Sequence, residues 1–261
     1  IPDGNYIISA VATDVAGNTG PAANRAVAVA TGRPSAPDFD DVAGDNIVNA
    51  AETADGVTIT GTTSAGTQVF VSIAGLFTDR EATVTGTDWS VTVSPAELGQ
   101  LPDGQPIQVT AFASDGVNRS VVSASDPVRV DRTPPGPATI DGPVEGDNVV
   151  NFSEAGDGVT ITGTAEAGGT VRVSWGGVNL TPVNVGENGR WTAVFDADDI
   201  PNDGNHTVRV IAVDAAGNPS ATPTELGVRV DTTVAAPTIA LASDTGSSGN
   251  DGITRNGTIN V

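Results

Sequence analysis

The sequence predicts an all-β protein made of tandem β-sandwich repeats of about 100 residues each. Short motifs recur along the chain at one spacing, which is the signature of a repeat array. Within each repeat, apolar and polar residues alternate in short runs that are separated by Gly-rich turns. About seven short strands with Greek-key connections are therefore expected in each repeat.

The repeat is visible in several independent motifs. Asp-Gly-Asn at 3–5 returns as Asp-Gly-Gln at 103–105 and as Asp-Gly-Asn at 203–205. The string VTITGT occurs at 57–62 and again at 159–164. Further matches are Asp-Asn-Ile-Val-Asn with Asp-Asn-Val-Val-Asn (45–49 and 147–151), Trp89 with Trp191, and TDVAGN with VDAAGN (13–18 and 213–218).

This period divides the chain into four parts. We expect the C-terminal part of one repeat at 1–32, complete repeats at 33–131 and 132–231, and the N-terminal part of a further repeat at 232–261. Neither end coincides with a predicted repeat boundary, so the sequence is expected to be a window on a longer array.

Strand periodicity is clearest in the middle of each repeat. Val69, Val71 and Ile73 alternate with polar or outward-facing residues, and Val171 and Val173 repeat the pattern. Trp89 and Trp191 follow Gly-rich turns at equivalent places and are expected in the two cores. Trp175 has two interpretations, a core residue, which we favour, or an exposed platform for a sugar or a partner.

The charge balance limits the partners. The chain has 32 acidic residues and 11 basic ones, all arginine, for a net charge of −21. Nucleic acid and anionic membrane surfaces need basic patches, so neither is an expected partner. No cysteine is present to form disulfides or thiolate metal sites, and no apolar run is long enough to span a bilayer.

The repeat resembles a known family. The segments VAGDNIVNAAE (42–52), VTITGTAEAGGTV (159–171) and DGNHTVRVIAVDAAGN (203–218) are similar to the bacterial immunoglobulin-like (Ig-like) repeats of giant adhesins and biofilm-associated surface proteins. The resemblance implies tandem Ig-like sandwiches in an extracellular stalk exported by type I secretion. SDTGSSGNDGITRNGT (243–258) looks like a variant repeat start from calcium-stiffened extender regions of such adhesins.

Acidic and amide residues gather where one repeat meets the next. Calcium is a hard cation that takes six to eight oxygen ligands, and related repeats hold it near such junctions. The candidate calcium ligands are Asp14, Asp40, Asp45, Asn46, Asn49, Glu52, Asp115, Asp131, Asp141, Asp147, Asn148, Asn151, Glu154, Asp214, Asp231, Asp244, Asn250 and Asp251. The alternative is that these residues only build turns, because Asp and Asn bond their own backbone.

The first junction departs from this pattern. Ala30 stands where the later junctions carry Asp131 and Asp231. Asp14, Asp38, Asp40 and Asp41 are candidates to replace the missing carboxylate. No EF-hand spacing occurs anywhere in the chain.

Catalytic chemistry is not expected. His206 is the only histidine and lies in a predicted turn beside Asp203, without the oriented partners that a triad needs. Asp198 and Asp199 adjoin Pro201 in a loop, where a solvated pair is a simpler interpretation than a glycosidase couple.

Three functions are compatible with the sequence. The first is a structural extender that projects an adhesive tip, contacts neighbouring repeats of its own chain and supports adhesion or biofilm formation. The second is a module that itself binds a cell-surface glycan, a receptor or a like adhesin. The third is an accessory domain of a secreted enzyme. Near-identical repeats without a distinctive loop favour the first, because spacers repeat and active sites rarely do.

Overall fold

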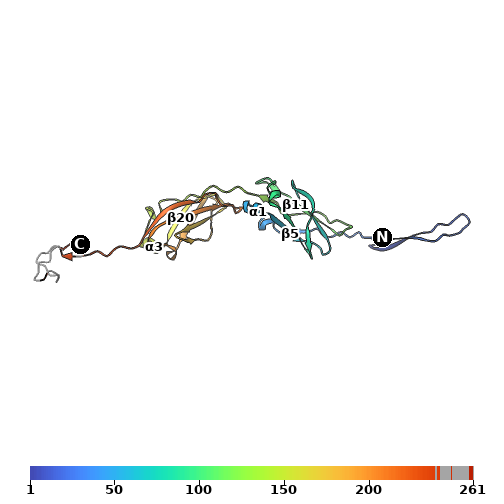
Figure 1. Cartoon of the computed structure of the whole chain (residues 1–261), viewed down its shortest axis with the longest axis horizontal. Helices are drawn as coiled ribbons and strands as arrows, with labels where there is room; N and C mark the ends of the chain where they lie inside the picture. Colours follow the sequence, from blue (N-terminus) through green and yellow to red (C-terminus); the bar gives the residue numbers. More distant parts are fainter. Residues whose placement is uncertain (239, 242–247, 249–258, 261) are drawn as a thin grey trace. The chain divides into compact units, whose positions relative to one another are not determined.

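The computed structural model describes residues 1–238, 240–241, 248 and 259–260. These residues form two compact units. The first comprises Ile1–Pro135 together with Val213–Ala221, and the second comprises Gly136–Ala212 and Thr222–Val261. Figure 1 labels α1 (Ala50–Asp55), β5 (Val57–Thr62) and β11 (Val109–Ser114) in the first, and α3 (Phe152–Asp157) and β20 (Gly204–Val213) in the second.

The chain begins with an antiparallel hairpin. Strand β1 (Gly4–Ala10) pairs with β2 (Ala23–Val29) in a continuous register from Gly4 opposite Val29 to Ala10 opposite Ala23. Apolar side chains of β1 such as Ile7 and Ile8 are exposed. The hairpin is thus a two-stranded ribbon without a core of its own.

The first sandwich is built from short, mostly antiparallel strands in two four-stranded sheets and one three-stranded sheet. The first sheet has the order β3 (Asp38–Phe39), β5, β9 (Asp88–Val93), β8 (Thr83–Thr85). The second has the order β12 (Ser123–Ala124), β11, β6 (Gln68–Ile73), β7 (Phe77–Glu81). The third has the order β10 (Pro106–Ile107), β13 (Val128–Val130), β4 (Ile47–Val48).

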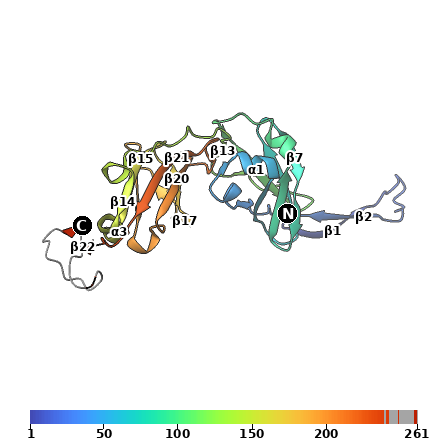
Figure 2. The ribbon, with the colours of Figure 1, turned by 60° about the vertical axis from the view of Figure 1, so that its left-hand side comes forward.

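The second sandwich repeats this plan with longer edge pairings. Strand β15 (Val159–Thr164) pairs with β19 (Arg190–Phe195). The larger sheet has the order β14 (Val149–Asn151), β21 (Thr224–Asp231), β20, β16 (Thr170–Trp175), β17 (Val178–Asn179), and β18 (Val183–Asn184) also pairs with β16. Figure 2 shows β20 and β21 side by side. Strand β22 (Ala240–Leu241) pairs with β23 (Ile259–Asn260).

In each sandwich the strand that precedes the first α-helix lies parallel to the last strand. Strand β4 pairs with β13 so that Val48 lies opposite Val130. Strand β14 pairs with β21 in the same sense, with Asn151 opposite Asp231. This pairing brings the start of each repeat against its end. The all-β, Ig-like sandwich fold predicted from the sequence is confirmed.

Short helices connect the strands, although the sequence shows no helical stripe. They are too short to present an apolar face over several turns, so periodicity alone does not reveal them. Besides α1 and α3 they are α2 (Pro95–Leu98) and the 3₁₀ turns η1 (Val42–Gly44), η2 (Val144–Gly146) and η3 (Ala197–Asp199). Each α-helix begins with a capping box, in which the N-cap side chain and a Glu three residues later satisfy each other's backbone N–H groups.

Trp89 and Trp191 anchor the two cores, as predicted, and each is only 1% exposed. Their indole rings lie against the glycine of the VTITGT motif. A Cβ on Gly61 or Gly163 would stand 2.7 or 2.6 Å from the indole, which is closer than side chains pack. The glycine of that motif is therefore required by the tryptophan opposite it.

Trp175 is also a core residue, as we favoured. It is fully buried and makes an edge-to-face contact with Phe195, with ring centroids 5.4 Å apart. The interpretation of Trp175 as an exposed stacking platform is therefore wrong.

Gly163→Ala tests this packing. The new methyl would collide with the Thr139 carbonyl and the Trp191 ring, so we expect the free energy of unfolding to fall by about 1–3 kcal/mol. Gly227→Ala is the matched control, because this strand glycine has open space around it. Its free energy of unfolding should differ from that of wild type by no more than about 0.5 kcal/mol. Urea denaturation of both variants measures the difference. An equal loss of unfolding free energy in the two variants would contradict the close packing of Gly163 against Trp191.

Candidate functional site

The acidic residues at the start of each repeat shape a tight turn. Asp45 Oδ1 accepts a hydrogen bond from the N–H of Ile47 at 2.9 Å, and Asn46 Oδ1 accepts one from the N–H of Val42 at 2.9 Å. Asn46 Nδ2 also donates to Asp41. In the second repeat, Asp147 and Asn148 make the two equivalent backbone bonds at 2.8 Å. These four candidate calcium ligands thus have a structural role in the turn.

The next candidates are the helix caps. Asn49 Oδ1 accepts from the N–H of Glu52 at 3.0 Å, while Glu52 Oε2 accepts from the N–H of Asn49 at 2.9 Å. Asn151 and Glu154 form the same reciprocal pair at the start of α3. Each side chain satisfies a backbone donor that the helix leaves without an intrahelical partner.

Asp14, Asp115 and Asp214 each begin a loop that ends in asparagine, and we call residues 14–18, 115–118 and 214–218 the Asp–Asn loops. Asp14 Oδ1 accepts from the N–H groups of Ala16 and Asn18 at 2.9 Å, and Asn18 Nδ2 donates to Asp14 Oδ2. The Asn18 side chain therefore lowers the pKa of Asp14. Asp214 and Asn218 make the corresponding bonds at 2.8 and 2.9 Å.

The shorter loop at 115–118 uses the same principle. Asp115 Oδ1 accepts from the N–H groups of Asn118 and Val117, at 2.6 and 2.8 Å. These bonds, that from Asn118 foremost, lower the pKa of Asp115. The loops at 14–18 and 115–118 thus favour the ionised form of their aspartates through local donors.

The loop at 214–218 is seated within the first unit. Asn218 is 2% exposed; its Oδ1 accepts from the N–H of Ala50 at 2.8 Å, and its Nδ2 donates to the backbone carbonyl of Asp131 at 2.8 Å. The shorter loop makes one similar contact, from Asn118 Nδ2 to the carbonyl of Ala30 at 3.3 Å. Ala30 and Asp131 are equivalent positions, so two Asp–Asn loops bind the same part of the repeat.

Sequence reasoning recognised the Asp-Gly motif only as a repeat marker, whereas its aspartate binds the segment that leaves the repeat. Asp203 accepts from the N–H and hydroxyl of Thr232, at 2.9 and 2.6 Å, and from the hydroxyl of Thr233 at 2.7 Å. These bonds, led by the Thr232 hydroxyl, lower the pKa of Asp203 to about 2. We call this arrangement the aspartate clasp.

The aspartate clasp recurs at both equivalent positions. Asp3 accepts from the hydroxyl and N–H of Thr31, which lower its pKa. At Asp103, desolvation opposes ionisation, but bonds from Thr133 and Arg132 outweigh it and lower the pKa. The spacing of about 29 residues between the aspartate and its threonine was the signal available in the sequence.

The remaining candidates are held by residues of an adjacent strand or of the strand that precedes them. Asp40 and Asp141 accept hydrogen bonds from threonines of the adjacent strand, at 2.7 and 2.9 Å. Bonds from Thr162 and then Arg190 lower the pKa of Asp141. Asp131 pairs with Arg129 and Asp231 with Arg229. Asp244, Asn250 and Asp251 lie outside the described residues.

The described part of the chain holds no group of three or more His, Cys, Asp or Glu side chains gathered for a metal ion. Around Asn218 it brings together the backbone carbonyl of Asp131 and the carboxylate of Asp214, which both accept from Asn218 Nδ2. The amide nitrogen of Asn49 stands 3.4 Å from where a Cβ of Gly217 would lie. The carbonyl and the carboxylate are oxygen groups of the kind that calcium takes as ligands. Calcium ligation by individual residues stays a prediction.

His206 lies in strand β20, opposite Val228, and not in the predicted turn; its Nε2 is 2.7 Å from the carbonyl of Asn202. Asp198 and Asp199 form the short turn η3. Neither arrangement provides the nucleophile, base and orienting group that acyl or glycosyl transfer requires.

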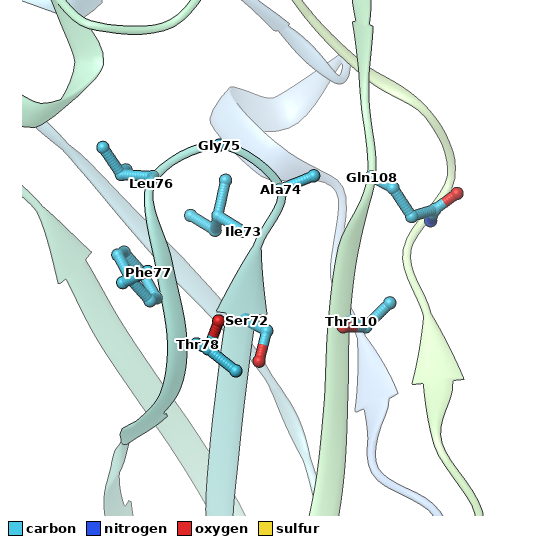
Figure 3. Close-up of a pocket in the computed structure, with 9 residues that line it drawn as sticks. All are labelled: Ser72, Ile73, Ala74, Gly75, Leu76, Phe77, Thr78, Gln108 and Thr110. Atoms are coloured by element: carbon cyan, nitrogen blue, oxygen red, sulfur yellow. The ribbon is translucent and has the colours of Figure 1, made fainter.

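A shallow hollow of about 420 Å³ opens between β6, β7 and β11 (Figure 3). Leu76 and Phe77 line one side, while Gln108 and Thr110 line the strand opposite. The guanidinium of Arg80 lies 3.6 Å from the centre of the Phe77 ring. The hollow combines one aromatic ring with hydroxyl and amide groups.

Residues 138–232 match the sequence model of the bacterial Ig-like domain, so this segment belongs to that family and the resemblance seen in the sequence is confirmed. The comparison with curated proteins gives no match. No helix among the described residues is long and apolar enough to cross a membrane.

Several solved structures are similar to the chain. One is a 1.5-MDa bacterial ice-binding adhesin, at 28% identity and a TM-score of 0.40, over 89% of this chain and 76% of that one. A second is a Ca²⁺-stabilized adhesin with which an Antarctic bacterium binds ice, at 26% identity and a TM-score of 0.40, over 92% of this chain and 60% of that one. A third is a bacterial immunoglobulin-like domain from the M. primoryensis ice-binding adhesin, at 30% identity and a TM-score of 0.29, over 38% of this chain and 100% of that one.

Asn218→Ala tests the seated loop. The change leaves the Ala50 N–H and the Asp131 carbonyl without their partner, so we expect a loss of about 1–3 kcal/mol in the free energy of unfolding. Faster hydrogen exchange of the Ala50 amide should accompany it. Asn18→Ala, in the exposed loop, is the control and should leave both quantities unchanged. An unaffected Ala50 amide in Asn218→Ala would refute the contact.

The aspartate clasp predicts a pH dependence. The pKa of Asp203 is about 2 in the folded chain, against an ordinary value of 3.8. The stability that its ionised carboxylate gives the fold is therefore complete above about pH 4 and is lost as pH falls toward about 2. Asp203→Ala should lower the melting temperature near neutral pH, and the difference from wild type should shrink across this acid window. Melts at several pH values measure it. A difference that stays constant down to about pH 2 would exclude the mechanism.

Proposed function

We propose that this chain, of which residues 138–232 are a bacterial Ig-like domain, is an extender segment of a large secreted bacterial surface adhesin. Its role is to hold a distal adhesive region away from the cell, in support of adhesion or biofilm formation. We further propose that calcium binds near the seated Asp–Asn loop and stiffens the array.

The recurrence of structural devices along the chain supports an extender role. The capping box, the start turn, the aspartate clasp and the Asp–Asn loop each occur at least twice with the same hydrogen bonds. The cores differ in detail, since Trp175 stands where the first repeat has Ile73, whereas the hydrogen bonds at the repeat ends recur. An extender needs many repeats whose ends fit one another, because each repeat only has to attach to the next. Such a role favours this pattern.

The observation that carries the calcium proposal is the placement of Asn218 among backbone and carboxylate oxygens. Asp214 is 9% exposed, and both its carboxylate oxygens accept hydrogen bonds from Asn218. Each carboxylate oxygen has a further lone pair available to a cation. A chain with a net charge of −21 repels itself, and a divalent cation at such a place would relieve that repulsion locally.

Calcium binding would act on the junction mechanically. A linker between two sandwiches is flexible by default, since contacts between domains of one chain are small and polar. A cation that binds oxygens from the loop, the helix cap and the exit of the preceding strand would restrict that freedom. The seated Asp–Asn loop, the cap at Asn49 and the exit residue Asp131 are the groups we assign to this role.

Direct ligand binding by the repeats is the second candidate, and the hollow in Figure 3 is the feature that favours it. Its Phe77 ring and its hydroxyl and amide groups are the kinds of group that bind sugars. Binding of the whole chain to a glycan array, lost in Phe77→Ala, would support this function over a purely structural one.

Calcium titration by calorimetry tests the leading proposal. Wild type should bind calcium, and Asp214→Asn should lower the stoichiometry by one site, while Asp88→Asn on a sandwich strand should not. Chelation should lower the free energy of unfolding by RT ln(1 + [Ca²⁺]/Kd), and the melting temperature with it. Small-angle scattering should then show a wider spread of shapes. Titration of Asp147→Ala/Glu154→Ala examines the equivalent place in the second repeat. Identical melts and scattering with and without chelator would exclude calcium stiffening.

A further inference from the structure

The larger sheet of the second sandwich turns one face away from the core. Val171, Val173 and Trp175 of β16 are buried. Because successive side chains of a strand point to opposite faces of its sheet, Arg172 and Ser174 point outward. An arginine therefore stands in the middle of this outer face.

The two strands beside β16 add further polar groups to the same face. On β20, Val208 and Val210 are buried, so Arg209 between them points outward. On β17, Asn179 pairs with Ser174, and residues directly opposite each other share a face of the sheet. The outer face thus gathers two guanidinium groups, a hydroxyl and an amide from adjacent strands.

These side chains line a hollow of about 310 Å³, which we call the β16–β20 hollow. Its lining combines the polar groups of this face with apolar side chains, and includes Arg172, Ser174, Asn179, Leu180, Arg209 and Ile211. No carboxylate lines it. The lining comes from the side of one sandwich, and none of it belongs to the segment that follows Asp231.

The positive charge of this hollow is only partly balanced. Arg209 lies 3.6 Å from Glu225, and both side chains are exposed. Arg172 makes no ion pair with a carboxylate in the part of the chain that the structure describes, whereas Arg190 and Arg229, on other strands of this sandwich, each have an aspartate partner. Like charges on one sheet face repel each other, so an anion bound between the two guanidinium groups would stabilise them.

The sandwich does not need an arginine at this place in order to form. Phe70 stands 102 residues before Arg172, which is the spacing of the two VTITGT motifs. In the first sandwich Phe70 stacks on Phe112, with ring centroids 5.1 Å apart. The hollow of Figure 3, on the same face of that sandwich, has no charged lining residue. The cationic hollow is therefore particular to the second repeat.

We propose that the β16–β20 hollow binds an acidic saccharide, a sugar ring that carries a carboxylate or a sulfate group. Arg172 and Arg209 bind the oxyanion, because the planar fork of a guanidinium matches two oxygens of such a group. Asn179 and Ser174 form hydrogen bonds with ring hydroxyls, and Leu180 offers apolar surface to the C–H face of the ring. This site goes beyond the extender function and does not depend on calcium binding.

The net charge of −21 opposes a long polyanion. At about 0.15 M salt, interactions between exposed charges more than about 8 Å apart are largely screened. The guanidinium groups that touch the ligand then outweigh the distant carboxylates. Short oligosaccharides, which carry few charges, are therefore the appropriate probes.

Titration of short oligosaccharides into the whole ¹⁵N-labelled chain, followed by NMR at about 0.15 M salt, tests the proposal. Tri-galacturonate supplies carboxylates, a sulfated trisaccharide supplies sulfates, and maltotriose is the neutral probe. The amide resonances of Leu180 and Arg209 should shift and saturate with at least one acidic probe and stay in place with maltotriose. Comparison of the two acidic probes shows which oxyanion the hollow prefers.

Arg172→Gln and Arg209→Gln each remove one guanidinium and should weaken binding about fivefold or more. Both side chains are exposed, so the fold should persist, and melting temperatures check this. Arg190→Gln is the matched control, because it removes the same charge from β19, which pairs in the other sheet of this sandwich. It should bind the acidic probe as wild type does.

Three results would overturn the proposal. They are no saturating shift with either acidic probe, a loss of affinity in Arg190→Gln equal to that in Arg172→Gln, and equal shifts with sodium acetate or sodium sulfate alone at the same concentration of charge. The last result would identify a site for simple anions and exclude a saccharide. The extender function is judged from chelator-dependent melts and scattering, so the two ideas fail independently.

Discussion

The parallel pairing of the last strand of each sandwich with the strand that precedes its first α-helix is the constraint from which the other features follow. Because β4 lies beside β13, the cap of α1 is adjacent to the residue that leaves the repeat. A helix N–H and a strand carbonyl are then held a short distance apart, and one amide side chain satisfies both. The seated loop is a consequence of strand topology, since neither partner alone would specify asparagine.

The same topology explains how a strongly acidic chain keeps its carboxylates in place. The aspartates of the start turns, the Asp–Asn loops and the aspartate clasps accept hydrogen bonds from nearby N–H or hydroxyl groups, and others pair with arginines. Donors of this kind stabilise the ionised form without a counter-charge. Acidic residues therefore serve two purposes. Each one stabilises local structure through its hydrogen bonds, and their summed negative charge produces a field that attracts cations.

Sequence reasoning was sufficient for features that depend on local pattern. The period identified equivalent residues, and the alternation of Val69, Val71 and Ile73 placed them in a core, where all three are buried. It was insufficient where function depends on distance across the fold. Asp203 reads as a turn residue, and only the folded chain shows that it binds Thr232. Asn49 and Glu52 resembled metal ligands because capping boxes and calcium loops use the same side chains.

The parallel β4–β13 pair also affects how a repeat responds to force. A pull on the two ends of the first sandwich, once it has passed the β3–β5 pairing and reaches β4, drives β4 and β13 along each other in opposite directions. Their backbone hydrogen bonds are then loaded together in shear and must break at once, whereas the bonds of a hairpin pulled at its open end break one by one. The aspartate clasp anchors the segment that follows the last strand, next to the point where the load is applied. The first sandwich thus has a strand pair loaded in shear next to the point where its chain leaves.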